Sequence, residues 1–220
     1  MRVVIAGGHG KIALKLESLL FAREDEPVGL IRNPAHATEV EAMGAQAVVC
    51  DLERADVSQV AEVLRGADAV VFAAGAGAGS GVERKYAVDR DGSILLAKAC
   101  EQVGVRRFVQ ISSMGAGQPP QAGSNEVWSA YINAKTEAED DLRSRGLNWT
   151  IVRPGRLTDD EGTGLVHLSQ SPVSAAEVSR DDVAAVVAEL LGVSATSGMT
   201  LELTGGDIPV REAVQRIAAG

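Results

Sequence analysis

The sequence of 220 residues predicts an α/β fold in which helices cover both faces of a doubly wound parallel sheet. Short apolar runs alternate with helix-length segments along the whole chain, which is the pattern of βαβ units. The hydrophobic share is 45% but the aromatic share is only 3%, so Ala, Val, Ile and Leu build the core. Such a composition suits parallel strands that are buried on both faces.

The expected elements follow one another in order. Strands are predicted over residues 3–6, 28–31, 47–49, 69–72, 108–111, 149–152 and 200–203. Helices are predicted over residues 11–22, 37–43, 57–64, 84–103, 129–145, 181–191 and 210–218. Right-handed crossovers then favour the strand order 3-2-1-4-5-6. We expect a single domain over residues 1–220, with a small C-terminal substrate lid mainly in residues 155–178.

Composition narrows the classes of partner. A net charge of −9 without a basic run argues against a nucleic-acid binder. The N-terminus enters a strand directly, and no apolar stretch approaches the ~20 residues of a membrane span, so we expect a cytoplasmic protein without a membrane partner. Cys50 and Cys100 lack metal-ligand spacing and are expected to be core thiols, so no metal is predicted. A monomer and a homodimer both remain open.

A glycine cluster follows the first predicted strand. The segment Gly7-Gly8-His9-Gly10-Lys11-Ile12-Ala13 fits a dinucleotide fingerprint either from Gly8 or, with longer spacing, from Gly7. A strand that ends in glycines and then opens a helix leaves backbone N–H groups and the positive end of the helix dipole facing outward. These donors suit a diphosphate, so the sequence predicts a Rossmann-type dinucleotide site.

Three further strand ends hold candidate coenzyme-binding residues. Arg32 follows the second strand, where an acid would bind the ribose 2′-hydroxyl of NAD and an arginine the 2′-phosphate of NADP. The nearby acids all precede that strand, so Arg32 favours NADP(H), with NAD(H) as the second choice. Asp51 follows the third strand, where its carboxylate could meet the adenine amino group or cap the next turn. After the fourth strand, the small residues Ala73-Ala74-Gly75 leave room for the pyrophosphate.

The fifth strand and the helix after it supply candidate catalytic residues. The strand ends in Ser112-Ser113, and Tyr131 and Lys135 stand four residues apart on the next helix, which places them on one face. A serine hydroxyl would hold a substrate oxygen, and Tyr131 would donate or accept the proton. Lys135 would bind the nicotinamide ribose and favour the phenolate.

These residues resemble the short-chain dehydrogenase/reductase superfamily, in particular its atypical branch with NmrA-like and biliverdin-reductase-B-like members. The resemblance spans nearly the whole chain and continues through Val88-Asp89-x-x-Gly92, Arg153-Pro154-Gly155 and Ser179-Arg180-Asp181. It implies that the coenzyme is lined by Gly7, His9, Gly10, Lys11, Ile12, Arg32, Asp51, Leu52, Ala73, Ala74, Gly75, Tyr131, Lys135 and Pro154.

Two departures from the family pattern bear on function. His9 stands where the branch often has Thr or Ala, and with Lys11 it adds positive charge beside the phosphates. The segment after Gly155 is short for the substrate domain of a sugar-nucleotide enzyme.

The resemblance therefore implies an NADPH-dependent reductase of a small carbonyl, quinone or flavin-like acceptor. An NAD-dependent sugar epimerase or dehydratase using the same residues is the first alternative. A non-catalytic NADP(H)-binding redox sensor is the second.

Overall fold

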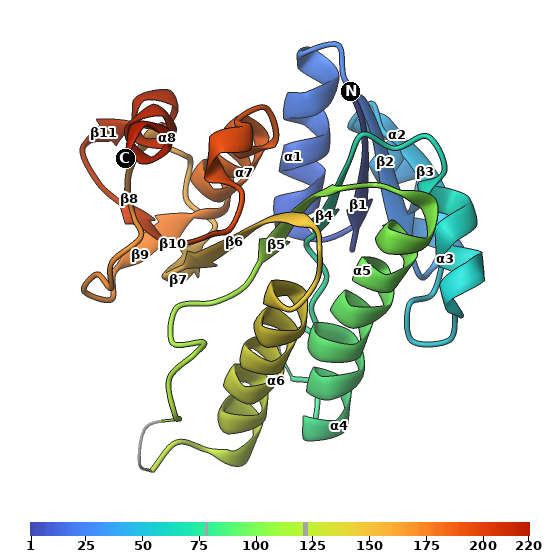
Figure 1. The fold of residues 1–220 in the computed structure, drawn as a ribbon, viewed down its shortest axis with the longest axis horizontal. Coiled ribbons are helices and arrows are strands. Elements are labelled where there is room, and N and C mark those ends of the chain that lie inside the picture. The colour runs from blue at the N-terminus through green and yellow to red at the C-terminus, as the bar shows by residue number, and fades with distance from the viewer. Residues whose placement is uncertain (78, 121–122) are drawn as a thin grey trace.

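The computed structural model describes residues 1–77, 79–120 and 123–220. Within these residues, nine strands form one sheet with helices on both faces (Figure 1). The parallel strands run in the order β3-β2-β1-β4-β5-β6-β10. Their bounds are Gln46–Val49, Glu26–Ile31, Arg2–Ala6, Ala69–Phe72, Arg107–Ile111, Asn148–Pro154 and Met199–Gly205. The predicted order 3-2-1-4-5-6 is confirmed, and β10 adds a seventh parallel strand.

Two antiparallel strands extend the sheet beyond β10. Strand β8 (Leu165–Ser169) pairs with β10, and β11 (Ile208–Pro209) pairs with β8. The sequence analysis did not predict either strand. Strand β8 lies within the segment 155–178, so part of the expected lid belongs to the main sheet. The rest of that segment includes β7 (Arg156–Thr158), which pairs in parallel with β9 (Glu177–Ser179) in a small second sheet.

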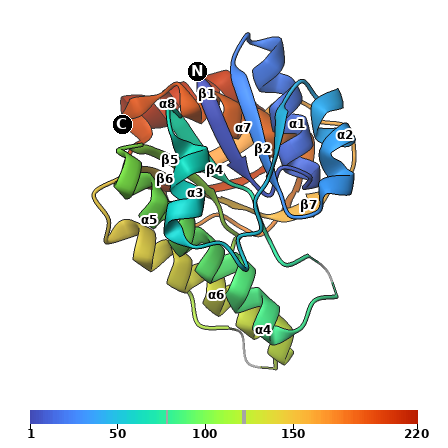
Figure 2. The ribbon, with the colours of Figure 1, turned by 90° about the vertical axis from the view of Figure 1, so that its right-hand side faces the viewer.

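Alternating side chains of the strands pack against helices on opposite faces. Val3 and Ile5 of β1 contribute to one core with α1 (Lys11–Ala22), α7 (Arg180–Leu191) and α8 (Val210–Ala219). Val4 and Ala6 contribute to the other, with α3 (Val57–Leu64), α5 (Gly92–Val103) and the end of α6 (Glu126–Arg143). The short α2 (Ala37–Ala42) packs beside α1 over a smaller cluster. Figure 2 shows the sheet between these two layers.

The long helix predicted over residues 84–103 is not uniformly α-helical. It begins as α4 (Val82–Arg84), widens into a π-helical segment over Lys85–Asp91 and continues as α5. Segments with π geometry are rare and occur frequently at functional sites. Here the wide turns bury the polar side chains of Lys85 and Asp89.

The strands β1, β4 and β5 point toward the N-terminal ends of α1 and α6 (Figure 1). Ligands of such sheets bind beyond the carboxyl ends of the strands, at the point where the strand order reverses. Among the helices that the structure describes, none is long and apolar enough to cross a membrane.

Candidate active site

The glycine turn connects β1 to α1 and is packed too closely for a side chain at Gly7 or Gly8. Gly7 has a φ of +83°, and a Cβ there would lie 2.6 Å from the Cα of Ala74. A Cβ on Gly8 would lie 2.6 Å from the Cα of Gly29 in β2. Gly7 therefore fits the longer-spaced form of the fingerprint, and Gly8 permits the close approach of the turn to β2.

The first turn of α1 presents unpaired backbone donors next to these glycines. Gly10 is the N-cap residue and provides no side-chain cap, and its amide donates to the carbonyl oxygen of Gly7 at 2.8 Å. The next three amides, from Lys11 to Ala13, have no intrahelical acceptor at a helix N-terminus, and the ladder of α1 begins with the amide of Leu14, which donates to the carbonyl oxygen of Gly10 at 2.9 Å. Ile12 packs on the core beneath them. A glycine-rich turn next to the free amides of the first helical turn fits the diphosphate of a dinucleotide.

Asp89 connects the glycine turn to the predicted catalytic residues. Its Oδ2 accepts a hydrogen bond of 3.0 Å from the amide of Ala76, just after the small residues that pack against Gly7. Its Oδ1 lies 3.1 Å from Nζ of Lys135. The two side chains are only 1% and 5% exposed. One buried carboxylate thus holds both the loop after β4 and the ammonium of Lys135.

Tyr131 lies beside this pair on the same face of α6. Nζ of Lys135 is 5.8 Å from the centroid of the Tyr131 ring, and Nζ of Lys85 lies 5.3 Å from it. Burial opposes the charged form of Lys135, but Tyr131, Asp89 and Glu139 outweigh it, so the pKa of Lys135 lies above its ordinary value. Lys135 is therefore held as an ammonium next to a phenol, as the proposed proton transfer requires.

The two predicted serines have different surroundings. Ser112 is buried, and its hydroxyl donates a short hydrogen bond of 2.5 Å to Oε1 of Glu139. Glu139 is fully buried and also accepts hydrogen bonds from Arg143 and Arg153. The hydroxyl of Ser113 is half-buried and, among the residues that the structure describes, donates to the carbonyl oxygen of Met114 alone, at 3.3 Å. The network around Glu139 thus engages Ser112, whereas Ser113 is the better placed of the two for a substrate oxygen.

Arg32 and Asp51, which we expect to contact the adenosine half of the coenzyme, both lie next to Glu53, an acid that the sequence analysis did not assign to the site. Nη1 of Arg32 lies 2.6 Å from Oε1 of Glu53, which is also 3.0 Å from Nη2 of Arg84. The carboxylate of Asp51 accepts a hydrogen bond of 3.1 Å from the amide of Glu53. Asp51 therefore caps the local turn, which is the alternative to contact with the adenine amino group. Leu52, between Asp51 and Glu53, packs on the core.

The two basic residues of this region, Lys11 and His9, also have carboxylate partners. Nζ of Lys11 lies 2.5 Å from Asp159, which is 2.6 Å from Nη1 of Arg180. Hydrogen bonding to Lys11 lowers the pKa of Asp159, and Arg180 adds to the effect. This contact ties the segment between β7 and β8 to the start of α1. Nε2 of His9 lies 3.0 Å from Glu39, and its ring stacks on His36.

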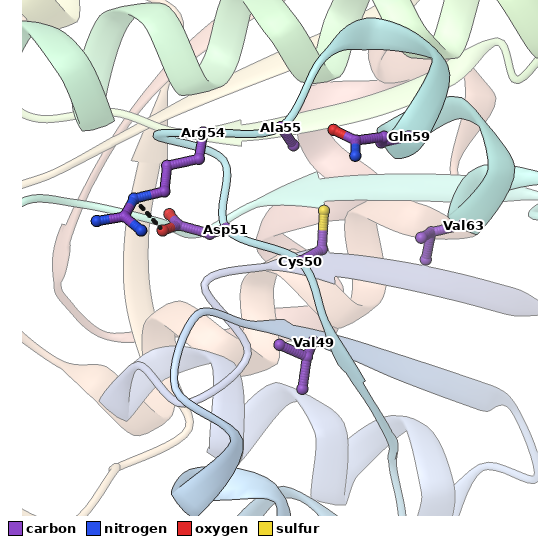
Figure 3. Close-up of a pocket in the computed structure, with 7 residues that line it drawn as sticks. All are labelled: Val49, Cys50, Asp51, Arg54, Ala55, Gln59 and Val63. Carbon is purple, nitrogen blue, oxygen red and sulfur yellow. Dashed lines mark ion pairs between the residues drawn. The ribbon is translucent and has the colours of Figure 1, made fainter.

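A shallow cavity of about 270 Å³ lies next to the adenosine end (Figure 3). It is lined by residues of the β3 end and α3, namely Val49, Cys50, Asp51, Arg54, Ala55, Gln59 and Val63. Asp51 alone among the expected coenzyme residues lines it, and the glycine turn does not, so this cavity is separate from the candidate diphosphate site. Burial raises the pKa of the Cys50 thiol.

The structure therefore gathers most of the predicted residues around the carboxyl ends of β1, β4 and β5. Pro154 lies nearby at the end of β6, and its carbonyl oxygen accepts a hydrogen bond from the amide of Met114. It adds Asp89, Lys85, Glu53 and Arg84, which the sequence analysis did not assign to the site. Only Asp89 carried a signal, since it belongs to the motif quoted for the family. Among the described residues no three His, Cys, Asp or Glu side chains gather as metal ligands.

Comparisons with known proteins show the family of the chain. Residues 7–193 match the model of the NAD(P)H-binding family. The Bacillus subtilis protein named uncharacterized sugar epimerase YhfK is 33% identical over 99% of this chain and 100% of its own length. A structure from Bacillus halodurans, described as an NAD-dependent epimerase/dehydratase, has a TM-score of 0.91 and 36% identity, covering 98% of this chain and 99% of that one.

The anaerobilin reductase ChuY of Escherichia coli O157:H7 has the same fold, with a TM-score of 0.80 and 26% identity over 94% of this chain and 98% of its own. The glycine turn, the sheet order and the family match agree with one another. The chain belongs to the NAD(P)H-binding family, in agreement with the atypical short-chain dehydrogenase/reductase branch that its sequence resembles.

Proposed function

We propose that this chain is an NADPH-dependent oxidoreductase that reduces a small carbonyl, quinone or flavin-like acceptor. The observation that carries the proposal is the continuous path from the glycine turn through Asp89 to Lys135 and Tyr131. A dinucleotide bound with its diphosphate on the turn would extend toward this group. The proposal includes a small-molecule substrate and the cytoplasmic location expected from the sequence, with a monomer or a homodimer as the active form.

The chain's own residues would each have one part in the reaction. The nicotinamide, when bound, supplies the hydride to the acceptor carbon. Tyr131 gives its hydroxyl proton to the acceptor oxygen as that oxygen gains charge, so the carbonyl becomes an alcohol. Ser113 would donate a hydrogen bond to the same oxygen, and Lys135, fixed by Asp89, would favour the phenolate left on Tyr131.

Arg32 supports NADP(H) as the preferred coenzyme, because a guanidinium matches the geometry of a 2′-phosphate. The carboxylate of Glu53 next to it keeps NAD(H) as a possible second coenzyme.

The names of two relatives favour a second candidate. The Bacillus subtilis protein carries the name of a sugar epimerase, and the Bacillus halodurans structure is described as an NAD-dependent epimerase/dehydratase. An enzyme of that kind uses its coenzyme catalytically. NAD⁺ that copurifies tightly, with no net oxidation of NADPH by any acceptor, would favour this candidate.

The test compares the two tyrosines of the chain. Oxidation of NADPH is followed with a panel of carbonyl, quinone and flavin acceptors for the wild type, Tyr131→Phe and Tyr86→Phe. Tyr86 is the matched control, because its ring lies against Arg90 rather than against Lys135.

We expect Tyr131→Phe to lower kcat about 10²–10⁴-fold, as loss of a proton donor does, while the Kd for NADPH stays unchanged. Tyr86→Phe should keep the wild-type rate. Unchanged turnover in Tyr131→Phe would remove this residue from the mechanism.

A further inference from the structure

Two arginines from different segments converge on one carboxylate at the end of β2. Arg32 follows β2 directly, Glu53 lies in the connection from β3 to α3, and Arg84 ends α4. Glu53 Oε1 lies 2.6 Å from Nη1 of Arg32 and 3.0 Å from Nη2 of Arg84. The Glu53 side chain is 26% exposed, and those of Arg84 and Arg32 are 38% and 53% exposed. All three groups can therefore reach a ligand.

The chemistry of this cluster matches the two forms of the coenzyme in opposite ways. Two guanidinium groups suit a phosphate monoester, which carries more than one negative charge. A carboxylate at this place accepts a hydrogen bond from the free 2′-hydroxyl of NAD. The sequence offers no acid at the end of β2, and the structure supplies one from the neighbouring connection.

We propose that Glu53 selects between NADP(H) and NAD(H), with Arg84 as a second ligand of the 2′-phosphate beside Arg32. This inference rests on the proposed function and deepens it. The charges of the cluster sum to +1, because two arginines face one carboxylate. A dianionic phosphate would bring the sum to −1, so Glu53 opposes its binding by repulsion and by occupying both guanidinium groups. With a neutral residue in place of Glu53, the phosphate would balance the arginines.

The same carboxylate also keeps the arginines in place. Hydrogen bonds from Arg84 and Arg32 lower the pKa of Glu53, so it is ionised at neutral pH and holds both side chains beside the end of β2. In the wild type the 2′-phosphate must displace this carboxylate, whereas NAD can use it as it stands. The wild type should therefore prefer NADP(H) over NAD(H) by a smaller factor than a chain with a neutral residue at position 53.

The experiment is isothermal titration of NADP⁺ and NAD⁺ into the full chain. The variants are Glu53→Gln, Arg84→Met and the two combined. Glu62→Gln is the matched control, because Glu62 is a carboxylate of α3 that pairs with Arg65 on the exposed surface. Melting temperatures of all variants check that each one folds.

Glu53→Gln should lower the Kd for NADP⁺ about tenfold, because it removes one unit of negative charge next to the phosphate. The same substitution should raise the Kd for NAD⁺. Arg84→Met should raise the Kd for NADP⁺ and leave the Kd for NAD⁺ unchanged. In the double variant, Arg84→Met should cancel the tighter NADP⁺ binding that Glu53→Gln produces. Glu62→Gln should leave the ratio of the two Kd values unchanged.

Two negative results have different meanings. If the wild type binds both coenzymes and Glu53→Gln leaves the ratio of their Kd values unchanged, the inference about Glu53 is overturned and the proposed function stands. If the wild type binds neither dinucleotide, the proposed function is overturned and this inference with it.

Discussion

Lys135 and Asp89 form a buried ion pair in which Nζ lies 3.1 Å from Oδ1, although the two residues come from different helices. The pair stands between the loop after β4 and the ring of Tyr131. It is therefore a structural connection of the fold as well as part of the candidate active site. Removing one partner of such a pair leaves the other charge buried without compensation.

Asp89→Asn should lower the free energy of unfolding by about 3 kcal/mol, because the ammonium of Lys135 would lose its carboxylate. Urea denaturation at neutral pH measures this change. Asp91→Asn is the control, since Asp91 is more than half exposed and pairs with Arg90 at the surface. An Asp89→Asn protein as stable as Asp91→Asn would show that the buried pair does not stabilise the fold.

The two serines after β5 should respond differently to substitution. Ser113→Ala should lower kcat by about 10²-fold, the effect of losing one hydrogen-bond donor to a developing oxyanion. Ser112→Ala should act mainly on stability, costing about 1–3 kcal/mol, because Glu139 would lose a buried donor. Steady-state kinetics and urea denaturation of both variants separate the two effects. A greater loss of kcat in Ser112→Ala than in Ser113→Ala would reverse the assignment.

The buried carboxyl of Glu17 should make the free energy of unfolding depend on pH. Its carboxyl is fully buried in α1 against Gly29, and neither oxygen has a hydrogen-bond partner among the residues that the structure describes. Burial raises the pKa of Glu17 to about 8 from 4.5. Between these two pH values the folded chain holds a proton that the unfolded chain releases. The contribution of Glu17 therefore lowers the free energy of unfolding as pH rises from 4.5 to 8.

Glu17→Met should remove this dependence, because it replaces the carboxyl with an apolar side chain of similar length. The variant should be more stable than the wild type by about 2–4 kcal/mol at pH 8, and the difference should shrink toward pH 4.5. Urea denaturation of both proteins across this range measures it. A difference that stays constant with pH would contradict the assignment of the titration to Glu17.

The sequence was informative where structure depends on neighbours along the chain. The strand order and the glycine turn both follow from local patterns, and both are confirmed. The Lys85–Asp91 segment is different, since its apolar spacing is compatible with an ordinary α-helix and does not indicate the π geometry that the structure has there. Strand β8 was missed because a run of five residues gives little signal without its partner strands β10 and β11.

The ion pairs of the site depend on contacts between distant segments. Glu53 meets Arg32 across 21 residues, and Asp159 meets Lys11 across 148. No spacing rule along the chain predicts such pairs, because they depend on how β3 and the segment after β7 lie against the glycine turn. The sequence thus identified the cations of the candidate coenzyme site but not the carboxylates that face them.

The central claim is that main-chain amides of the glycine turn hold the diphosphate of a dinucleotide. Crystals of the chain grown with NADP⁺ test it most directly. We expect electron density for the diphosphate within hydrogen-bond distance of the amides that follow Gly10, with the nicotinamide next to Tyr131. A coenzyme bound elsewhere, or a turn closed by side chains with no dinucleotide on it, would contradict the account.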